Sequence, residues 1–182
     1  MSDGEERKIM DLRIIKTRNQ IRTAFLSLRD KFMPEKIRVK DICDKAMINK
    51  TTFYKYYEDS SDLCNEIEED AIQIVLESFT CKDLLFDDPK KYFEDLVSVL
   101  ERQAGELQVI FRGKQEVFSS KLSEKLIKLY EDASASLEDK IKLSFAIGGF
   151  VRVANDYLFA NMKYDFETLS QYSENMIKSM AR

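Results

Sequence analysis

The stretch from Ile37 to Leu63 constrains the fold more than any other, because its pattern fits two short helices joined by a tight turn. It reads IRVKDICDKAMINKTTFYKYYEDSSDL. Apolar residues of the first helix fall at three- and four-residue spacing: Val39, Ile42, Cys43 and Ala46. Asn49 is a good cap for the second helix, since its side-chain oxygen can accept from the backbone N–H near Thr52. Two helices in this arrangement form a helix-turn-helix.

Helical spacing continues along most of the chain, with no strand-like alternation and no internal repeat. The 182 residues include only 5 glycines and 2 prolines, which also favours helices. We therefore predict an all-α protein of about nine helices. Residues 1–58 form a three-helix head that contains the helix-turn-helix, and residues 59–182 form a larger helical body.

Capping residues and breakers predict where the helices begin and end. Pro34 ends the first helix, Asp59 caps the fourth, and Asp88-Pro89 starts the fifth, which Gly105 ends. Asp165 caps the last helix. The middle of the long helix, residues 143–151, is apolar almost all round, which predicts burial between two layers. The expected ranges are 8–32, 39–46, a short helix after 49, 59–79, 89–104, a short helix to 111, 114–134, 137–162 and 166–180.

The composition argues against catalysis and against metal binding. The chain has no histidine, which removes Ser-His and Cys-His nucleophile systems and histidine-bearing metal sites. Its 3 cysteines show no CxxC spacing, and Cys43 and Cys64 fall in apolar helical patterns, which favours buried thiols over a redox sensor. We expect no enzyme activity, no metal and no cofactor. No apolar run approaches the roughly 20 residues of a membrane helix and no signal peptide is evident, so a cytoplasmic protein without a membrane partner is expected.

Charge is distributed unevenly along the chain. Residues 7–57 hold 14 Lys and Arg against 5 Asp and Glu, a balance of +9, whereas residues 58–182 hold 15 against 25, a balance of −10. A basic first third is typical of a head that faces a polyanion such as nucleic acid. A solvated basic face with no partner would show the same balance.

The head resembles the tetracycline-repressor (TetR) family of one-component bacterial regulators over about residues 10–70. The run KTTFYKYYED is close to the family signature. Three positions depart from the pattern: Met47 replaces the usual turn glycine, Arg38 a common Ser or Thr cap, and Ser60 a common lysine. The matching residues are Arg18, Ile21, Ala24, Phe25, Leu28, Val39, Asp41, Ile42, Ala46, Ile48, Asn49, Thr52, Phe53, Tyr54, Tyr56, Tyr57 and Leu63.

The resemblance implies double-stranded DNA as a partner. Ile42, Ala46, Ile48 and Phe53 have the spacing of a small core that holds the two helices. Threonine and lysine side chains can read base edges in the major groove, with Lys50 the main candidate for specificity, and tyrosine hydroxyls can bind phosphates. The bland alternative is a helical hairpin whose tyrosines pack against the body. The candidate DNA-binding residues are Arg38, Lys40, Asn49, Lys50, Thr51, Thr52, Tyr54, Lys55, Tyr56 and Ser60.

The body is expected to carry a dimer interface and an effector pocket, as the resemblance implies. Two adjacent glycines in an apolar helix cost roughly 1 kcal/mol each, which close helix approach in a dimer, ligand contact or tight packing within one subunit would offset. An apolar pocket with a few polar groups suits an organic effector. Arg152 in such a pocket would select an anionic effector, but it could instead form a salt bridge in the dimer interface. Candidate effector residues are Phe111, Phe118, Tyr130, Arg152 and Asn155; candidate dimer residues are Gly148, Gly149, Tyr157, Leu169 and Met176.

We therefore expect a homodimeric regulator that binds a palindromic operator and is released from it by a small organic effector. Most members of the family are repressors, but the KTTFY segment also occurs in a branch with an activator, so both signs of regulation stay open. The alternative is a helical protein–protein interaction module or coactivator whose head no longer reads DNA strongly. Weak or absent salt-dependent DNA binding would favour that alternative.

Overall fold

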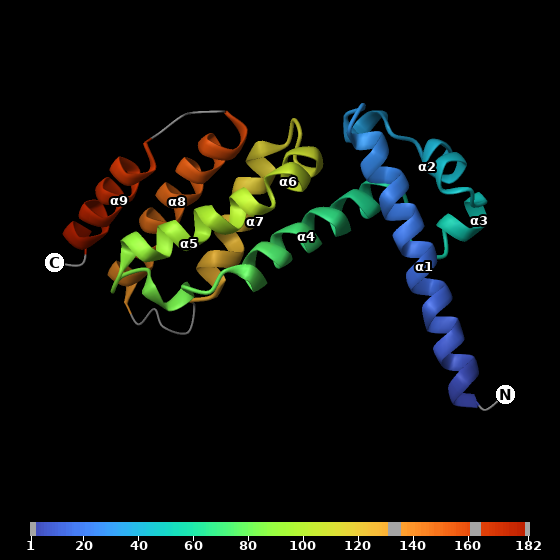
Figure 1. Cartoon of the computed structure of the whole chain (residues 1–182), viewed down its shortest axis with the longest axis horizontal. Coiled ribbons are helices and arrows are strands. Elements are labelled where there is room, and N and C mark those ends of the chain that lie inside the picture. The colour runs from blue at the N-terminus through green and yellow to red at the C-terminus, as the bar shows by residue number, and fades with distance from the viewer. Residues whose placement is uncertain (1–2, 131–135, 161–164, 181–182) are drawn as a thin grey trace. The chain divides into compact units, whose positions relative to one another are not determined.

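The computed structural model describes residues 3–130, 136–160 and 165–180. Nine α-helices and two short 3₁₀ helices make up the regular structure of these ranges, and no strand occurs in them (Figure 1). The all-α prediction of about nine helices is confirmed. The predicted ends of two helices, at 131–134 and 161–162, lie outside the described residues. No described helix is both long enough and apolar enough to cross a membrane.

The chain forms two compact units, Met1–Glu68 and Glu69–Arg182. The division falls inside one continuous helix, α4 (Ser60–Ser78), after its ninth residue. The first unit holds α1 (Asp3–Arg29), η1 (Pro34–Lys36), α2 (Val39–Ala46), α3 (Lys50–Phe53) and the start of α4. The functional boundary expected after residue 58 stays a prediction.

In the first unit, α2 packs against the C-terminal half of α1 and α3 packs against α2, while α1 extends past α2 toward its own N-terminus (Figure 1). Ile21 and Phe25 of α1 are buried together with Ile42 and Phe53. Among the side chains described, which begin at residue 11, the apolar stripe of α1 is buried only from Ile21 onward. The helix also ends earlier than predicted, at Arg29, where the last turn tightens and the Lys31 N–H donates to the Leu28 carbonyl three residues back at 3.0 Å.

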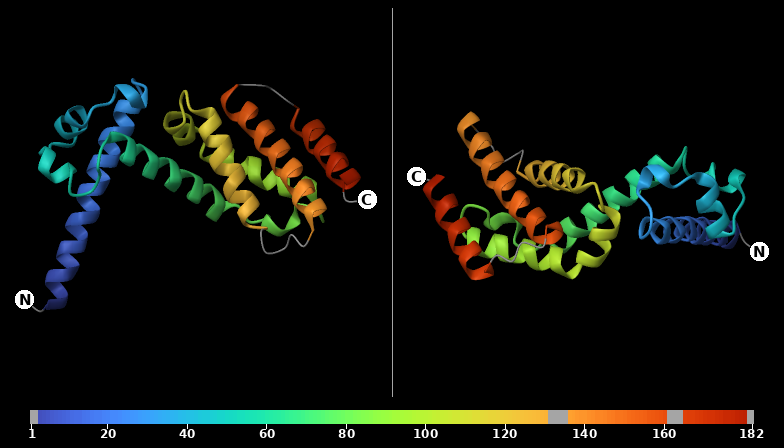
Figure 2. Two further views of the ribbon diagram at one scale, coloured as in Figure 1. Left: turned by 180° about the vertical axis from the view of Figure 1, so that it is seen from behind. Right: turned by 90° about the horizontal axis from the view of Figure 1, so that it is seen from above.

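The second unit is a helical bundle. It holds η2 (Lys82–Leu84), α5 (Pro89–Arg102), α6 (Ala104–Ile110), α7 (Gln115–Lys128), α8 (Leu137–Phe159) and α9 (Phe166–Met180). α8 packs against α7 and α5, and α9 lies along α5 (Figure 2). Aromatic rings fill the interior: Phe93 stacks on Phe150 at 5.2 Å between ring centroids, and Tyr92 meets Phe79 edge to face at 4.9 Å.

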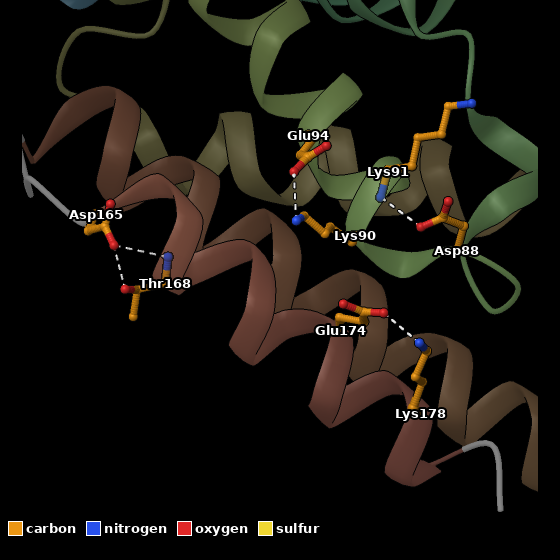
Figure 3. A network of polar contacts seen from close by, with 8 residues as sticks. All are labelled: Asp88, Lys90, Lys91, Glu94, Asp165, Thr168, Glu174 and Lys178. Atoms are coloured by element: carbon orange, nitrogen blue, oxygen red, sulfur yellow. Dashed lines mark hydrogen bonds and ion pairs between the residues drawn. The ribbon is translucent and has the colours of Figure 1, made fainter.

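Carboxylate caps begin the helices at the predicted places. The Asp88 side chain accepts from the Lys91 N–H at 3.1 Å, with Pro89 as the first helical residue of α5. The Asp165 side chain accepts from the Thr168 N–H, also at 3.1 Å, and starts α9 (Figure 3). Figure 3 also shows ion pairs four residues apart on these two helices, Lys90–Glu94 and Glu174–Lys178.

Two predictions from glycine and apolar content are wrong. Gly105 does not end α5; the break comes at Gln103, and Gly105 lies inside α6. A terminating glycine adopts a positive φ, and of the described glycines this holds for Gly113, at 71°, just after α6. Nor is the middle of α8 buried on every side, because Phe145 is 68% exposed and both Gly148 and Gly149 lie on the surface.

Asp95 of α5 holds the segment that follows α4. Its carboxylate accepts from the Thr80 N–H at 2.7 Å, the Thr80 hydroxyl at 2.9 Å and the Cys81 N–H at 2.8 Å. Burial disfavours the charge, but these hydrogen bonds outweigh burial and place the pKa of the Asp95 carboxyl below its ordinary value. The carboxylate therefore stabilises the folded body in its ionised form.

We expect Asp95→Asn to lower the free energy of unfolding by about 1–2 kcal/mol near neutral pH, after allowance for solvent screening. A depressed folded-state pKa gives stability that is present above the unfolded value of about 3.9 and is lost as pH falls through the folded value. The difference in the free energy of unfolding between wild type and variant should therefore become smaller in acid. Urea unfolding at about pH 7 and about pH 2.5 measures it, and an equal gap at both would contradict this role of the charge.

Candidate nucleic-acid interface

The turn between α2 and α3 has the geometry of a helix-turn-helix, even though it lacks glycine. Met47 adopts the left-handed conformation, with φ 55° and ψ 44°, and its N–H donates to the Cys43 carbonyl. The Ile48 N–H donates to the same carbonyl at 3.0 Å. This pair of bonds closes α2 in the way a C-terminal glycine does, at a cost of roughly 1–2 kcal/mol for a residue with a Cβ.

The α3 helix is short, and its orientation is fixed by one buried ring. Phe53 is fully buried and lies 5.6 Å from the Tyr57 ring, centroid to centroid. Ile42 and Ala46 of α2 are buried in the same unit, whereas Ile48 is half-buried. The core predicted for the helix-turn-helix is therefore present, with Ile48 at its edge.

Four of the ten predicted DNA-binding side chains are exposed on α3 and on the turn after it. Lys50, Thr51 and Lys55 are exposed, and Tyr54 is 56% exposed. Thr52, Tyr56 and Ser60 are half-buried, whereas Lys40 and Asn49 are exposed. Two lysine ammonium groups, one exposed threonine and one tyrosine phenol therefore lie within one short segment. Such groups form hydrogen bonds with base edges and phosphates.

Two predicted contact residues are already engaged within the chain. The Asn49 side-chain oxygen accepts from the Thr52 N–H at 2.7 Å and from the Thr52 hydroxyl at 2.9 Å, which confirms it as the cap of α3. Arg38 donates from Nε and Nη2 to the two carboxylate oxygens of Asp41 at 3.0 and 3.1 Å. The hydrogen bonds from Arg38 hold the pKa of the Asp41 carboxyl below its ordinary value. A phosphate contact by Arg38 would compete with this ion pair.

The start of α4 is capped as predicted. The Asp59 carboxylate accepts from the Ser61 N–H at 2.7 Å and the Asp62 N–H at 2.9 Å, and Asp62 in turn accepts from the Glu58 N–H at 3.0 Å. Two backbone donors at this helix start are therefore bonded to a carboxylate. A phosphate contact near Ser60 would rely on its hydroxyl rather than on those two donors.

A charged cluster that sequence reasoning missed joins α1, the end of the helix-turn-helix and α4. Glu66 accepts from the buried Tyr57 hydroxyl at 2.8 Å and forms an ion pair with Arg18. The Arg18 guanidinium lies 6.0 Å from the centroid of the Tyr57 ring, and burial raises the pKa of the Tyr57 phenol. Arg18 and Glu66 are 48 positions apart, so no local pattern indicates the pairing. We call this trio the Glu66 cluster.

The candidate effector residues do not all lie together in the buried interior of the second unit. Phe111 and Phe118 are fully buried, 5.2 Å apart between ring centroids, and the Tyr130 hydroxyl donates to the Lys82 carbonyl. Arg152 instead has a 75% exposed side chain and pairs with Asp156 on its own helix at 2.9 Å. It does not face the buried interior, because it lies on the exposed face of α8. The Asn155 side-chain oxygen is buried and lacks a hydrogen-bond partner in the described structure.

The candidate dimer residues lie mostly on exposed faces of α8 and α9. A Cβ added to Gly148 or Gly149 would meet no described atom within 4 Å, so packing within one subunit does not require these glycines. Met176 is exposed and Leu169 is half-buried, whereas Tyr157 donates its hydroxyl to Glu101 of α5. The prediction missed four further exposed apolar residues on these two helices: Leu137, Ile141, Phe145 and Tyr172.

No protein-family model matches the sequence, and no curated protein matches it. Solved structures do. A TetR transcriptional regulator from Streptococcus agalactiae 2603V is similar with a TM-score of 0.64 and 23% identity, over 94% of this chain and 98% of that chain. The dihydroxyacetone kinase operon activator DhaS is similar with a TM-score of 0.55 and 20% identity, over 91% of this chain and 96% of that chain.

The fatty acid degradation regulator FadR from Bacillus halodurans is similar with a TM-score of 0.55 and 13% identity, over 88% of this chain and 93% of that chain. All three neighbours are named as regulators, and each match extends over nearly the whole length of both chains. The chain therefore has the fold of the TetR transcriptional regulators.

Proposed function

We propose that the protein is a DNA-binding transcription regulator whose α3 enters the major groove of an operator. The observation that carries the proposal is the exposed set Lys50, Thr51, Tyr54 and Lys55 on a capped helix that Phe53 anchors. N-terminal residues of such a helix contact base edges. Lys50 donates to guanine acceptors, Thr51 reads a neighbouring base, and Tyr54 and Lys55 bind phosphates.

We further propose that the regulator works as a homodimer through α8 and α9. In α8, the residues Leu137, Ile141 and Phe145 recur every fourth position and are all exposed, and Gly148 and Gly149 continue the exposed face. Tyr172 and Met176 of α9 repeat the pattern. An unpartnered apolar stripe of this length on two neighbouring helices suits a second copy, and the glycines would let two backbones approach closely. Two heads would then bind a palindromic site.

Release by a small organic effector is the mechanism we propose for regulation. The buried, unpartnered oxygen of Asn155 supports a polar ligand contact in the body. In the body, Glu69 of α4 pairs with Lys121 and, at 3.0 Å, with Lys125 of α7. One turn earlier in α4, Glu66 bonds to the head. An effector that favours one arrangement of α7 would shift α4 and so alter the population of DNA-competent heads.

The sign of regulation follows from where the operator lies relative to its promoter. Repression by occlusion is our first proposal. Activation is the alternative supported by the structural similarity to DhaS, which is named an operon activator. A protein-interaction module is the second candidate function, and the exposed Leu12 and Ile15 on α1 favour it as surfaces for a protein partner.

Selection of binding sites from a random double-stranded DNA pool tests the proposal, with the winners compared at about 50 mM and about 200 mM salt. Enrichment of a palindrome whose affinity falls steeply with salt is the expected result. A folded protein that enriches no sequence at either concentration would exclude operator reading by the head alone, and the protein-interaction candidate would take its place.

Lys50→Ala should relax the base preference at one position of each half-site and weaken binding to the selected operator by about 1–3 kcal/mol. Lys55→Ala is the matched control, because both lysines are exposed but only Lys50 lies at the start of α3. The control should lower affinity for all sequences and reduce the salt dependence without changing base preference. Repeating the selection with both variants measures this; identical sequence profiles for Lys50→Ala and wild type would remove Lys50 from specificity.

A further inference from the structure

Met47 is exposed at a strained position, and the fold itself gains nothing from its side chain. The residue is 90% exposed and is the non-glycine with positive φ among the described residues. A left-handed backbone disfavours any side chain with a Cβ, and glycine would close α2 by the same hydrogen bonds without strain. An exposed thioether at such a site is best explained by a contact made outside the chain.

The position of Met47 indicates what that contact is. It closes α2 two residues before Asn49, the cap of α3, and three before Lys50, so in the sequence it adjoins the end of α3 that enters the groove in the proposed complex. It also lies at a shallow groove of about 770 Å³ between α1 and α2, where Lys16 and Lys45 are further lining residues. Both lysines are exposed, and they give the surroundings of the thioether the charge that a DNA backbone attracts.

We propose that Met47 is a specificity residue that packs against the C5-methyl group of a thymine beside the bases read by α3. This inference rests on the proposed DNA-binding function. The thymine methyl is the one apolar group that a base pair presents in the major groove. Methionine suits it, because the unbranched thioether adapts its shape and is polarizable. The contact makes each half-site prefer an A·T pair of one orientation at the border of the region that α3 reads.

A double-mutant cycle across the interface tests the contact. Each thymine of the selected operator is replaced in turn by deoxyuridine, which lacks only the methyl group. For the wild-type protein, replacement of one particular thymine in each half-site should lower the affinity for the operator about fourfold, which corresponds to the burial of one methyl group. For Met47→Gly, the same replacement should have no effect, and Met47→Asn, which tolerates the left-handed backbone, should behave like Met47→Gly.

The stability of the variants separates this contact from a structural role. Met47→Gly should raise the melting temperature of the head, since it removes strain, while it weakens operator binding and relaxes the preference for thymine. A wild-type protein that binds no operator contradicts the proposed function itself. If the wild-type protein binds the operator but responds to each deoxyuridine replacement as Met47→Gly does, the Met47 contact is overturned while the proposed function stands. A selected site without a thymine at that border has the same meaning.

Discussion

Phe145→Glu should convert the protein from a dimer to a folded monomer and weaken operator binding by about 100-fold or more. The side chain is 68% exposed in the single chain, so a carboxylate there leaves the bundle intact. In the proposed dimer it would bring two carboxylates into an apolar contact around a twofold axis, where each lacks water and a counter-charge. A monomer binds half-sites one at a time and loses the effective concentration that joins two heads.

Leu129→Glu is the matched control. Leu129 is also an exposed apolar residue of the second unit, but it lies at the end of α7 and outside the α8 and α9 stripe. Sedimentation velocity gives the oligomeric state, circular dichroism the helix content, and a binding titration the operator affinity. The control should stay dimeric. If both variants remain dimers with wild-type affinity, the stripe on α8 is not the interface and the homodimer proposal needs another surface.

Helix starts could be predicted from the sequence because the interactions that create them are local. Asn49, Asp59, Asp88 and Asp165 each accept from backbone N–H groups two or three residues later, and side-chain type and spacing are enough to indicate such a cap. Helix ends were less well predicted. Glycine marks an end only when its backbone takes a positive φ, and the sequence does not show that Gly105 continues a helix whereas Gly113 follows one.

Burial of apolar residues was the main error, because a sequence pattern does not distinguish contact with the same chain from contact with a partner. The centre of α8 is apolar almost all round, a pattern that predicts a helix buried between two layers. In the single chain, Ile147 and Phe150 are buried while Phe145 is exposed. The apolar stripe of α1 divides in the same way, with Leu12 and Ile15 exposed and Ile21 buried.

At the candidate site, the sequence predicted which residues would be exposed on α3 but not how they are engaged. The exposure of Lys50 follows from its charge, and that of Tyr54 from its place next to the buried Phe53. The ion pair of Arg38 with Asp41 and the Glu66 cluster depend on side-chain rotamers and on contacts far apart in the chain. Those contacts decide which charges are available to a phosphate, and only the three-dimensional structure shows them.

Phe53→Ala should unfold most of the head. The ring is fully buried and is the single large side chain through which the four residues of α3 join the core with Ile42 and Tyr57. Removing it costs about 3–5 kcal/mol, against a total stability of about 5–15 kcal/mol for a whole small protein. Amide hydrogen exchange should show lost protection from α1 to α3 while the bundle of the second unit stays protected, and DNA binding should be abolished.

Tyr54→Ala at the adjacent position separates the fold of the head from its contacts. Tyr54 touches Phe53 edge to face at 5.7 Å between centroids but is 56% exposed, so its loss should cost the fold only about 1 kcal/mol. Operator affinity should nevertheless fall for every sequence, because the phenol is proposed to bind a phosphate. If the amides stay protected in both variants and Phe53→Ala keeps full DNA affinity, then α3 is held in place by something other than the Phe53 ring. Loss of protection only in Phe53→Ala, with DNA binding weakened in both variants, would separate the roles of the two neighbours: Phe53 points into the core and holds the head together, and Tyr54, the C-cap of α3, points outward and contacts DNA.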